Sequence, residues 1–385
     1  MISFKLTLLS TIIFSSAAIA QHTSLRSGEQ WPDNNGVHVN AHGGGMLYQK
    51  GTYYWFGEHK ISGRGGNAAQ VGVHCYSSKD LYNWKDEGIA FQVDTVNANS
   101  EVAKGCVIER PKVVYNKKTG KYVMWFHLEL KGKGYEAARA AVAVSDKVTG
   151  PYKYLHSFRP NAGKWPLNAS ASDTTEVAGG DASIANRPGN ELAENGFFLR
   201  RDHKGGQMSR DMTIFQDDDG KAYLIGSAEE NYTLNISELT PDYTNVTGKW
   251  TRIFPGGHNE APALLKKDGK YFLITSGCTG WDPNAARSAV ANTIWGPWKS
   301  LGNPCIGDDA HLTFHSQSTY IFPVAGKKDA FIFMADRWTP RNPIDGRYIW
   351  LPVQFEQEKP VLKWMDNWTL DFFNEKTAPK TATGK

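Results

Sequence analysis

The sequence HNEAPALLKKDGKYFLI, residues 258–274, decides the fold, because it reads as two short apolar strands around a Lys-Asp-Gly turn. A carboxylate, Glu260, stands immediately before the first apolar run. The same arrangement recurs along the chain, and most recurrences place a potentially catalytic side chain at the same position. A series of such hairpins predicts a repeated architecture. The other four hairpins span residues 44–58, 111–126, 212–225 and 318–334.

Weaker aromatic segments follow the hairpins, for example SSKDLYNWKDEG and VANTIWGPWKSLG. Each repeat therefore reads as about four strands, with a period of about 50 residues or more, which is typical of a propeller blade. A blade cannot bury both of its faces alone, so the blades must stack around an axis. We predict an all-β fold, a five-bladed β-propeller, in which residues 347–364 complete the fifth blade and residues 30–39 close the ring.

Composition limits the classes of partner. The 385 residues can bury a large core, and the aromatic share of 12% favours β structure. The net charge of +4 is small and the basic residues are scattered. We therefore expect no nucleic-acid partner and no membrane partner. A monomer is expected.

The N-terminus is typical of a cleavable signal peptide over residues 1–20. An apolar run over residues 6–14 follows Lys5, and the small residues Ala18 and Ala20 suit signal peptidase. The run is too short to span a bilayer, and the absence of a cysteine near the cut argues against a lipid anchor. We expect a periplasmic or secreted protein.

The mature chain reads as a single catalytic domain. Residues 21–374 form the predicted propeller, and residues 375–385 a disordered tail. About 50 extra residues, near 158–207, are predicted to form a long loop on one rim. Four cysteines in an exported chain permit disulfides; we favour Cys278–Cys305 over Cys75–Cys106, with buried reduced thiols as the alternative.

In a propeller the inner strand of each blade starts beside the axis, so the residue before it faces the central funnel. Carboxylates that converge there raise one another's pKa, which is costly for stability and favours a functional interpretation. The alternative is a set of core salt bridges, because Arg110 and Arg210 stand beside two of the acids. The converging positions are Asn40 or His42, Glu109, Asp211, Glu260 and Gln317.

Paired carboxylates across a cleft suggest glycoside hydrolysis. The phrases SRDMTIFQDDDGKAY, NEAPALLKKDGKYFLITSGCTGW and SQSTYIF together resemble glycoside hydrolase family 43, and within it the exo-β-1,3-galactanase branch. The resemblance covers residues 40–373. Most of the family carries an Asp base before the first blade, whereas this chain has Asn40-Ala41-His42 and departs from that pattern, as the galactanase branch does.

The resemblance implies four catalytic residues. Glu260 matches the general acid, and Asp211 the carboxylate that tunes its pKa and orients it. Gln317 matches the group that activates water, through its imidic tautomer, and Glu109 a further acid of the site. The alternative is that Gln317 only positions water and Glu109 takes the proton. Either route needs the acid and the water-side group about 6.5–9.5 Å apart, which predicts inversion of configuration.

Sugar binding calls for aromatic faces and polar groups at the funnel mouth. Trp281 and Trp338 follow the second strands of the fourth and fifth hairpins; stacking on a sugar and packing at the rim are both open to them. Thr279 and Asp336 each stand two residues before one of these tryptophans and are polar candidates.

Two further residues near the first hairpin are candidates for substrate binding. Glu58 ends its second strand and could grip sugar hydroxyls, or it could pair with Lys60 at the surface. His42 lies in a Gly-rich segment and could lie near the substrate or serve the structure.

The leading hypothesis is an exported hydrolase that releases galactose from the non-reducing end of β-1,3-galactan, the backbone of arabinogalactan, with inversion. No cofactor and no protein-held metal are expected, although an axial calcium ion stays open. One alternative is an α-L-arabinofuranosidase or galactofuranosidase on the same fold. The other is a sugar-binding propeller without hydrolytic activity.

Overall fold

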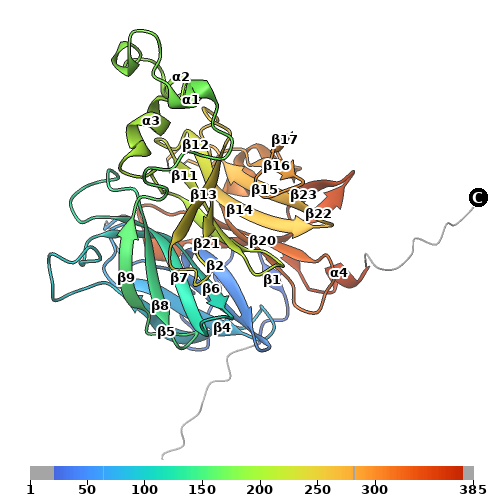
Figure 1. Ribbon diagram of the computed structural model, residues 1–385. Helices are drawn as coiled ribbons and strands as arrows, with labels where there is room; N and C mark the ends of the chain where they lie inside the picture. The colour runs from blue at the N-terminus through green and yellow to red at the C-terminus, as the bar shows by residue number, and fades with distance from the viewer. Residues whose placement is uncertain (1–20, 64, 281, 376–385) are drawn as a thin grey trace, which may run out of the picture.

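The computed structural model describes residues 21–63, 65–280 and 282–375. Its sheets are arranged side by side around a centre, and the fold is an all-β propeller, as predicted (Figure 1). We number the blades along the chain. The first four blades each have four antiparallel strands in chain order, so the first strand of each lies innermost.

The bounds of these strands follow the predicted hairpins. Blade 1 contains β2 (His42–Gln49), β3 (Thr52–His59), β4 (Gly72–Ser78) and β5 (Lys85–Gln92). Blade 2 contains β6 (Val107–Asn116), β7 (Lys121–Glu129), β8 (Arg139–Ser145) and β9 (Lys153–Phe158). Blade 3 contains β10 (Met212–Gln216), β11 (Ala222–Ala228), β12 (Thr233–Leu239) and β13 (Val246–Ile253). Blade 4 contains β14 (Glu260–Lys267), β15 (Lys270–Ser276), β16 (Arg287–Ala291) and β17 (Lys299–Gly302).

The predicted count of five blades is wrong, because the described chain forms six. Blade 5 has three strands, β19 (Gln317–Pro323), β20 (Phe331–Arg337) and β21 (Arg347–Pro352). Blade 6 is a separate sheet in which β23 (Lys359–Lys363) lies between β22 (Gln354–Glu356) and β18 (Cys305–Ile306). The segment expected to complete blade 5 thus pairs in part with residues that precede that blade.

Five inner strands nevertheless form a closed ring. β2 contacts β6, β6 contacts β10, β10 contacts β14, β14 contacts β19, and β19 contacts β2. Blade 6 supplies no strand to this ring. All five predicted hairpins are confirmed, and their inner strands meet at the centre.

The hairpin turns explain how the strands pair so tightly. Lys50 and Gly51 join β2 to β3, and Asp268 and Gly269 join β14 to β15. All four residues have positive φ, between 49° and 81°. Two successive positive φ values are the mark of a type I′ turn, whose twist matches that of the flanking strands, and glycine suits its second position.

The ends of the chain close the structure. β1 (Leu25–Arg26) pairs with β24 (Asn367–Trp368), which joins the two ends of the chain. The predicted segment 30–39 also links blade 1 to blade 5, since Trp31 packs against the buried rings of Trp55 and Trp350. The core between blades 1 and 5 is rich in aromatic side chains.

The segment near 158–207 is a folded insertion rather than the predicted plain loop. It contains α1 (Ala171–Thr174), η1 (Asp181–Ser183), α2 (Gly189–Glu194) and α3 (Phe197–His203), which project beyond blade 3 (Figure 1). Its small core packs against Tyr232. Short helices elsewhere are η2 (Ala310–His315), η3 (Pro343–Asp345) and α4 (Phe372–Glu375).

Three other predictions concern the cysteines and the termini. All four cysteines are free thiols, so neither favoured disulfide is present. The signal peptide and almost all of the predicted tail lie outside the described residues. Across the described ranges, no helix is long and apolar enough to cross a bilayer.

Candidate active site

The starts of the inner strands surround one pocket of about 320 Å³. It is lined by polar and charged side chains from blades 1 to 5 and by the connections above them. The lining residues are Glu58, Asn67, Glu109, Arg110, His127, Tyr135, Arg210, Asp211, Asn231, Glu260, Gly280, Gln317 and Trp338.

Three of the inner strands begin in the same way. Glu109 and Glu260 each precede a residue with positive φ, Arg110 at 56° and Ala261 at 52°, and the strand register shifts there. His42 in β2 is followed by Gly43, with φ 59° and a shift of its own. Such bulges bend a strand and re-aim its side chains, and they are common beside active sites. Here they turn Glu109 and Glu260 into the pocket.

A carboxylate from one blade holds the bulge of the next. Gly43 N–H donates to Asp336 Oδ2 at 2.6 Å, and Arg110 N–H donates to Glu58 Oε1 at 2.9 Å. Ala261 N–H donates to Asp211 Oδ2 at 3.1 Å. These contacts join blade 5 to blade 1, blade 1 to blade 2, and blade 3 to blade 4. Because each bulge amide lacks a ladder partner, the carboxylates both satisfy it and fix neighbouring blades together.

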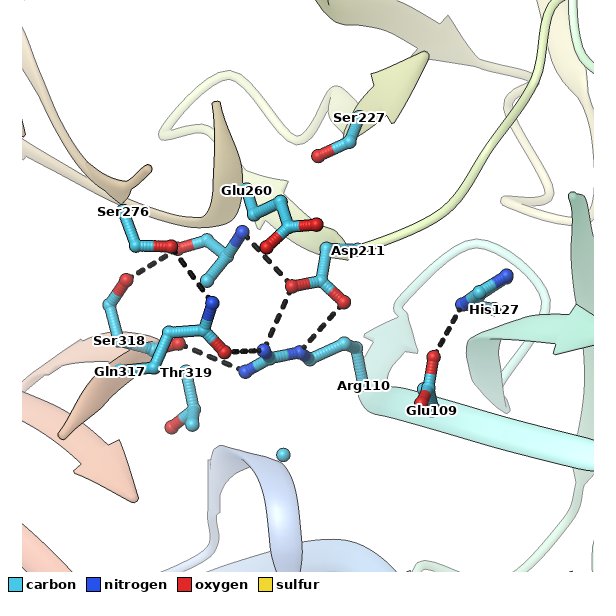
Figure 2. A network of polar contacts seen from close by, with 12 residues as sticks. Glu109, Arg110, His127, Asp211, Ser227, Glu260, Ser276, Gln317, Ser318 and Thr319 are labelled. Atoms are coloured by element: carbon cyan, nitrogen blue, oxygen red, sulfur yellow. Dashed lines mark hydrogen bonds and ion pairs between the residues drawn. The ribbon is translucent and has the colours of Figure 1, made fainter. Parts of the chain in front are cut away.

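Arg110 links the two sides of the pocket. Its guanidinium donates to both oxygens of Asp211, at 3.1 and 2.8 Å, and also to Gln317 Oε1 (Figure 2). A third donor reaches the carbonyl of Ser318 at 3.0 Å. Gln317 Nε2 donates to Ser276 Oγ at 2.9 Å. The amide oxygen of Gln317 thus accepts from a donor, Arg110, and its nitrogen donates to an acceptor, Ser276 Oγ, so both ends of the amide are fixed.

Glu260 sits in the part of the pocket that favours a protonated carboxyl. Burial raises its pKa to about 7, and the neighbouring Asp211 adds to the effect, while Arg110 and the thiol of Cys278 work against it. Asn231 Nδ2 donates to Glu260 Oε1 at 2.7 Å and orients the group. A carboxyl with a pKa near neutrality can hold a proton and give it up at working pH.

The surroundings of Glu109 favour the ionised carboxylate, in contrast to those of Glu260. Burial opposes its ionisation, but hydrogen bonding to His127 and the charge of that ring hold its pKa at about 2. Glu109 Oε2 contacts His127 Nδ1 at 2.9 Å (Figure 2). Oε1 accepts from Asn67 Nδ2 at 2.6 Å and from Tyr135 O–H at 2.8 Å. Two acids of one pocket thus differ in pKa because their neighbours differ.

Two predicted substrate contacts lie beneath the pocket instead of lining it. His42 is 1% exposed, stacks under Trp338 at 4.8 Å, and bonds to the Pro343 carbonyl at 2.8 Å. Asp336 is likewise 1% exposed and holds Gly43. Neither lines the pocket, because the ring of Trp338 and the backbone of β2 lie above them.

Glu58 and Trp338 do line the pocket. Glu58 Oε2 pairs with Lys60 Nζ at 2.6 Å, but both side chains are buried, so this is not the surface pair considered above. Thr279 does not line the pocket, since its hydroxyl bonds to the Asp282 carbonyl and accepts from Asn284. Trp281 lies outside the described residues.

The cluster of Glu109, His127 and Asp211 is the one group of ligand-type side chains close enough for a metal ion in the described part of the chain. It does not suit a cation. Both nitrogens of His127 already face carboxylates, and both oxygens of Asp211 accept from Arg110. Lys112 is also buried nearby, and its Nζ donates to the carbonyls of Gly43 and Arg110 at 2.8 and 3.3 Å; burial and the charge of Arg110 lower its pKa to about 7.

Comparison with known proteins gives this pocket a context. The model of glycosyl hydrolases family 43 matches residues 194–337. A solved family 43 β-1,3-galactosidase, in complex with galactodeoxynojirimycin, is 54% identical, with a TM-score of 0.85 over 90% of this chain and 100% of that one. The chain belongs to glycoside hydrolase family 43.

Two other similar proteins are less alike in sequence. The exo-β-1,3-galactanase of Phanerochaete chrysosporium, solved with galactose, is 32% identical with a TM-score of 0.73, over 92% of this chain and 70% of that one. A curated β-D-galactofuranosidase of Aspergillus niger is 32% identical over 29% of this chain. The chain spans about a third or less of the curated relatives it matches.

Sequence reasoning missed several residues of this family 43 pocket. Asn67, Tyr135 and Asn231 lie in connections between strands, where no periodic signal marks them. His127 could have been found, because it pairs with Glu109 across the predicted second hairpin. Arg110 was considered only as a neutralising charge, whereas it contacts both Asp211 and Gln317.

Proposed function

We propose that this chain hydrolyses β-1,3-galactan from its non-reducing end and releases galactose with inversion of configuration. The observation that carries the proposal is Glu260, whose pKa is raised to about 7 by burial and by Asp211, in a polar pocket where the blades meet. The names of two solved relatives, a β-1,3-galactosidase and an exo-β-1,3-galactanase, support the choice of sugar and linkage.

Glu260 would act as the general acid. Its proton goes to the glycosidic oxygen as the bond to the anomeric carbon breaks, and the anionic form left behind is stabilised by Arg110 and Asn231. Asp211 would tune this acid through its negative charge. It would also hold the acid in place, because it accepts the N–H of Ala261 next in sequence to Glu260.

Gln317 would act on the water side. Arg110 donates to its Oε1 and so favours the ordinary amide form in the resting pocket. The imidic form, which could take a proton at nitrogen, would be favoured if Arg110 turned from Gln317 toward Asp211 when substrate binds. Until then the amide can only orient a water molecule.

Glu109 is a poor candidate for the base. A carboxylate with a pKa of about 2 has little affinity for the proton of water, and three donors already engage its oxygens. We therefore propose that Glu109 stays anionic and supports the positive charge that develops on the sugar ring in the transition state.

Product analysis tests the function. Incubated with β-1,3-galactan, the protein should release galactose alone, and proton NMR at early times should show the α-anomer first. Arabinan and aryl galactofuranosides serve as the comparison substrates, since an A. niger relative is named a β-D-galactofuranosidase. Hydrolysis of the furanosides alone would favour the furanosidase alternative, and no hydrolysis of any glycoside would favour a sugar-binding protein.

Three expectations from the sequence stay proposals. We propose that residues 1–20 direct export to the periplasm or medium and are removed, which N-terminal sequencing of the recovered protein would test by a first residue of Gln21. We propose that the protein is a monomer, which light scattering would test. We also propose that the reaction uses water and no cofactor.

A further inference from the structure

A buried chain of three titratable side chains runs from the pocket into blade 2. Glu109 Oε2 contacts His127 Nδ1 at 2.9 Å, and His127 Nε2 contacts Glu129 Oε1, also at 2.9 Å. Glu129 Oε2 accepts from Ala138 N–H at 2.9 Å. The side chain of His127 is 1% exposed and that of Glu129 is 0% exposed. Glu109 and His127 line the pocket, whereas Glu129 does not.

We propose that His127 and Glu129 are positioning residues that keep Glu109 ionised and fixed in orientation, so that it serves the proposed hydrolysis as a permanent anion and not as a proton acceptor. This inference rests on the proposed function for its catalytic meaning. The protonation of His127 that it requires can be measured without any substrate.

With both carboxylates ionised, the hydrogen-bond polarity of the chain requires this charge state. An ionised carboxylate can only accept, so an imidazole between two carboxylates must donate from both nitrogens, and only the imidazolium form does so. A neutral ring would set a nitrogen lone pair against a carboxylate. The pKa of His127 agrees: burial lowers it, but bonding to Glu109 and Glu129 outweighs burial and raises it to about 9.

Glu129 is what makes the ring a cation. With Glu109 alone, a neutral His127 could donate from Nδ1 and leave Nε2 unprotonated. The carboxylate of Glu129 disfavours an unprotonated Nε2. The N–H of Ala138 donates to the other oxygen of Glu129 and holds this carboxylate in place. Glu129 therefore acts on Glu109 from beyond the ring, with no contact to the pocket.

The other charges around Glu109 do not replace this effect. Lys60 lowers the pKa of Glu109 from a distance, and Asn67 and Tyr135 donate to Oε1. Arg110 interacts with it electrostatically, and the anions Glu58 and Asp211 and the acid Glu260 share the pocket. These acids disfavour another negative charge, so a cation in direct contact is needed to keep Glu109 ionised.

The test replaces Glu129 with Gln. The amide must set its oxygen toward Ala138 N–H and its NH₂ toward the ring, which forces His127 to become neutral. Glu109 then loses its cationic partner, and its pKa rises. We expect the acidic limb of the kcat/KM profile on β-1,3-galactobiose to move up by one pH unit or more. Glu136→Gln, which removes an exposed charge from the same β7–β8 connection, should leave the profile unchanged.

Nitrogen NMR of the ring gives the independent readout. In the parent protein at pH 7.5, the His127 signals, identified by their loss in His127→Gln, should be those of an imidazolium. In Glu129→Gln they should be those of a neutral ring. A neutral ring in the parent protein would overturn the proposal even if Glu129→Gln did not fold. A neutral ring in Glu129→Gln with an unmoved acidic limb would also overturn it.

These outcomes separate the inference from the proposed function. If the parent protein hydrolyses no galactan but His127 is an imidazolium, the function fails and the charge state of the chain stands. If it hydrolyses galactan but His127 is neutral, the function stands and the inference fails. A uniform loss of rate in Glu129→Gln, with the shape of the profile kept, would reduce His127 and Glu129 to a structural role.

Discussion

At the residue scale, the chemistry of the pocket comes from how neighbours act on chemically similar groups. Glu260 and Glu109 start from the same intrinsic pKa, yet burial beside Asp211 raises the pKa of one, and contact with His127 lowers that of the other. One is thereby suited to give a proton and the other to stay charged. Separated pKa values within one site are how carboxylates come to have different roles.

The raised pKa of Glu260 predicts the basic limb of activity. The general acid must be protonated, so kcat/KM should fall as pH rises through about 7. Glu260→Gln should lower kcat on unactivated galactobiose by about 10²- to 10⁴-fold. The kcat of Glu260→Gln should fall much less on an aryl galactoside with a good leaving group, since departure of that group needs no proton. Steady-state rates across pH measure both, and a basic limb retained in Glu260→Gln would contradict the assignment.

The same shift has a stability consequence of definite sign. The folded-state pKa of Glu260 lies above its ordinary value of 4.5, so its contribution to stability is present below that value and is lost as pH rises through about 7. Glu260→Gln cannot ionise at this position. The melting temperature of the variant, relative to that of the parent protein, should therefore rise between pH 5 and 8. Thermal unfolding followed across that range would show it.

Gln317 gives a prediction on the water side. Gln317→Ala removes the group that we expect to act on water, so hydrolysis should fall by about 100-fold or more. Azide needs no deprotonation, and it should restore turnover and yield the α-galactosyl azide, the product expected from attack opposite a β-linkage. Glu109→Gln should not be rescued. Rescue of Glu109→Gln in place of Gln317→Ala would reverse the two assignments.

At the scale of elements, the bulges at the starts of β2, β6 and β14 are the devices that build the pocket. Each places a residue with positive φ directly after His42, Glu109 or Glu260, and a carboxylate from another blade holds its amide. The cost of a non-glycine residue in that conformation at Arg110 and Ala261 is about 1 kcal/mol each, offset by charge-assisted hydrogen bonds.

Gly43 tests this device. A Cβ there would lie 2.2 Å from Glu58 Oε1, and the residue has φ +59°, so Gly43→Ala should both strain the bulge and displace Glu58. We expect a loss of about 2–4 kcal/mol in the free energy of unfolding, together with a higher KM. Gly51→Ala is the matched control, because its φ is +81° but nothing lies near the added Cβ. The free energy of unfolding of Gly51→Ala should fall by about 1 kcal/mol, and its KM should stay unchanged. Equal losses would show that the contact with Glu58 does not matter.

At the scale of the whole molecule, stability depends on closing the ring of blades. β1 and β24 join the two ends of the chain, and Trp368 from β24 donates to the Trp350 carbonyl at 2.8 Å in the largest aromatic cluster. The pocket needs all five inner strands in place. Loss of the β1–β24 pairing should therefore also disturb the pocket, although the pairing lies outside it.

Trp368→Ala should lower the free energy of unfolding by about 3–5 kcal/mol, because a ring only 4% exposed is replaced by a cavity. Trp165 on the insertion is 37% exposed, and Trp165→Ala should cost much less. Urea unfolding of both variants measures the difference. Similar values would mean that β24 does not contribute to closure.

Metal removal gives a second prediction at this scale. The side-chain nitrogen of Lys112 already binds backbone carbonyls of blades 1 and 2, and the nearby acid cluster is fully engaged by hydrogen-bond donors. EDTA treatment should therefore leave both kcat/KM and the melting temperature unchanged. Loss of activity on chelation, restored by calcium, would contradict this expectation.

The sequence by itself determined what depends on local order. Alternating apolar residues and Gly-containing turns specify five hairpins, and the residue before each apolar run specifies which side chains reach the centre. For this reason Glu260, Gln317, Asp211 and Glu109 could be named in advance. Motif resemblance, rather than spacing, suggested their roles.

Only the tertiary structure decided what depends on distant contacts. The sixth blade arises because β18 and β23, far apart in sequence, pair side by side, which no local pattern encodes. Asp336 and His42 lie beneath the pocket, and Asn67, Tyr135 and Asn231 line it, because segments from different blades pack together there. The charge of each acid is decided in the same way, since burial and neighbours fix a pKa and both are properties of the folded chain.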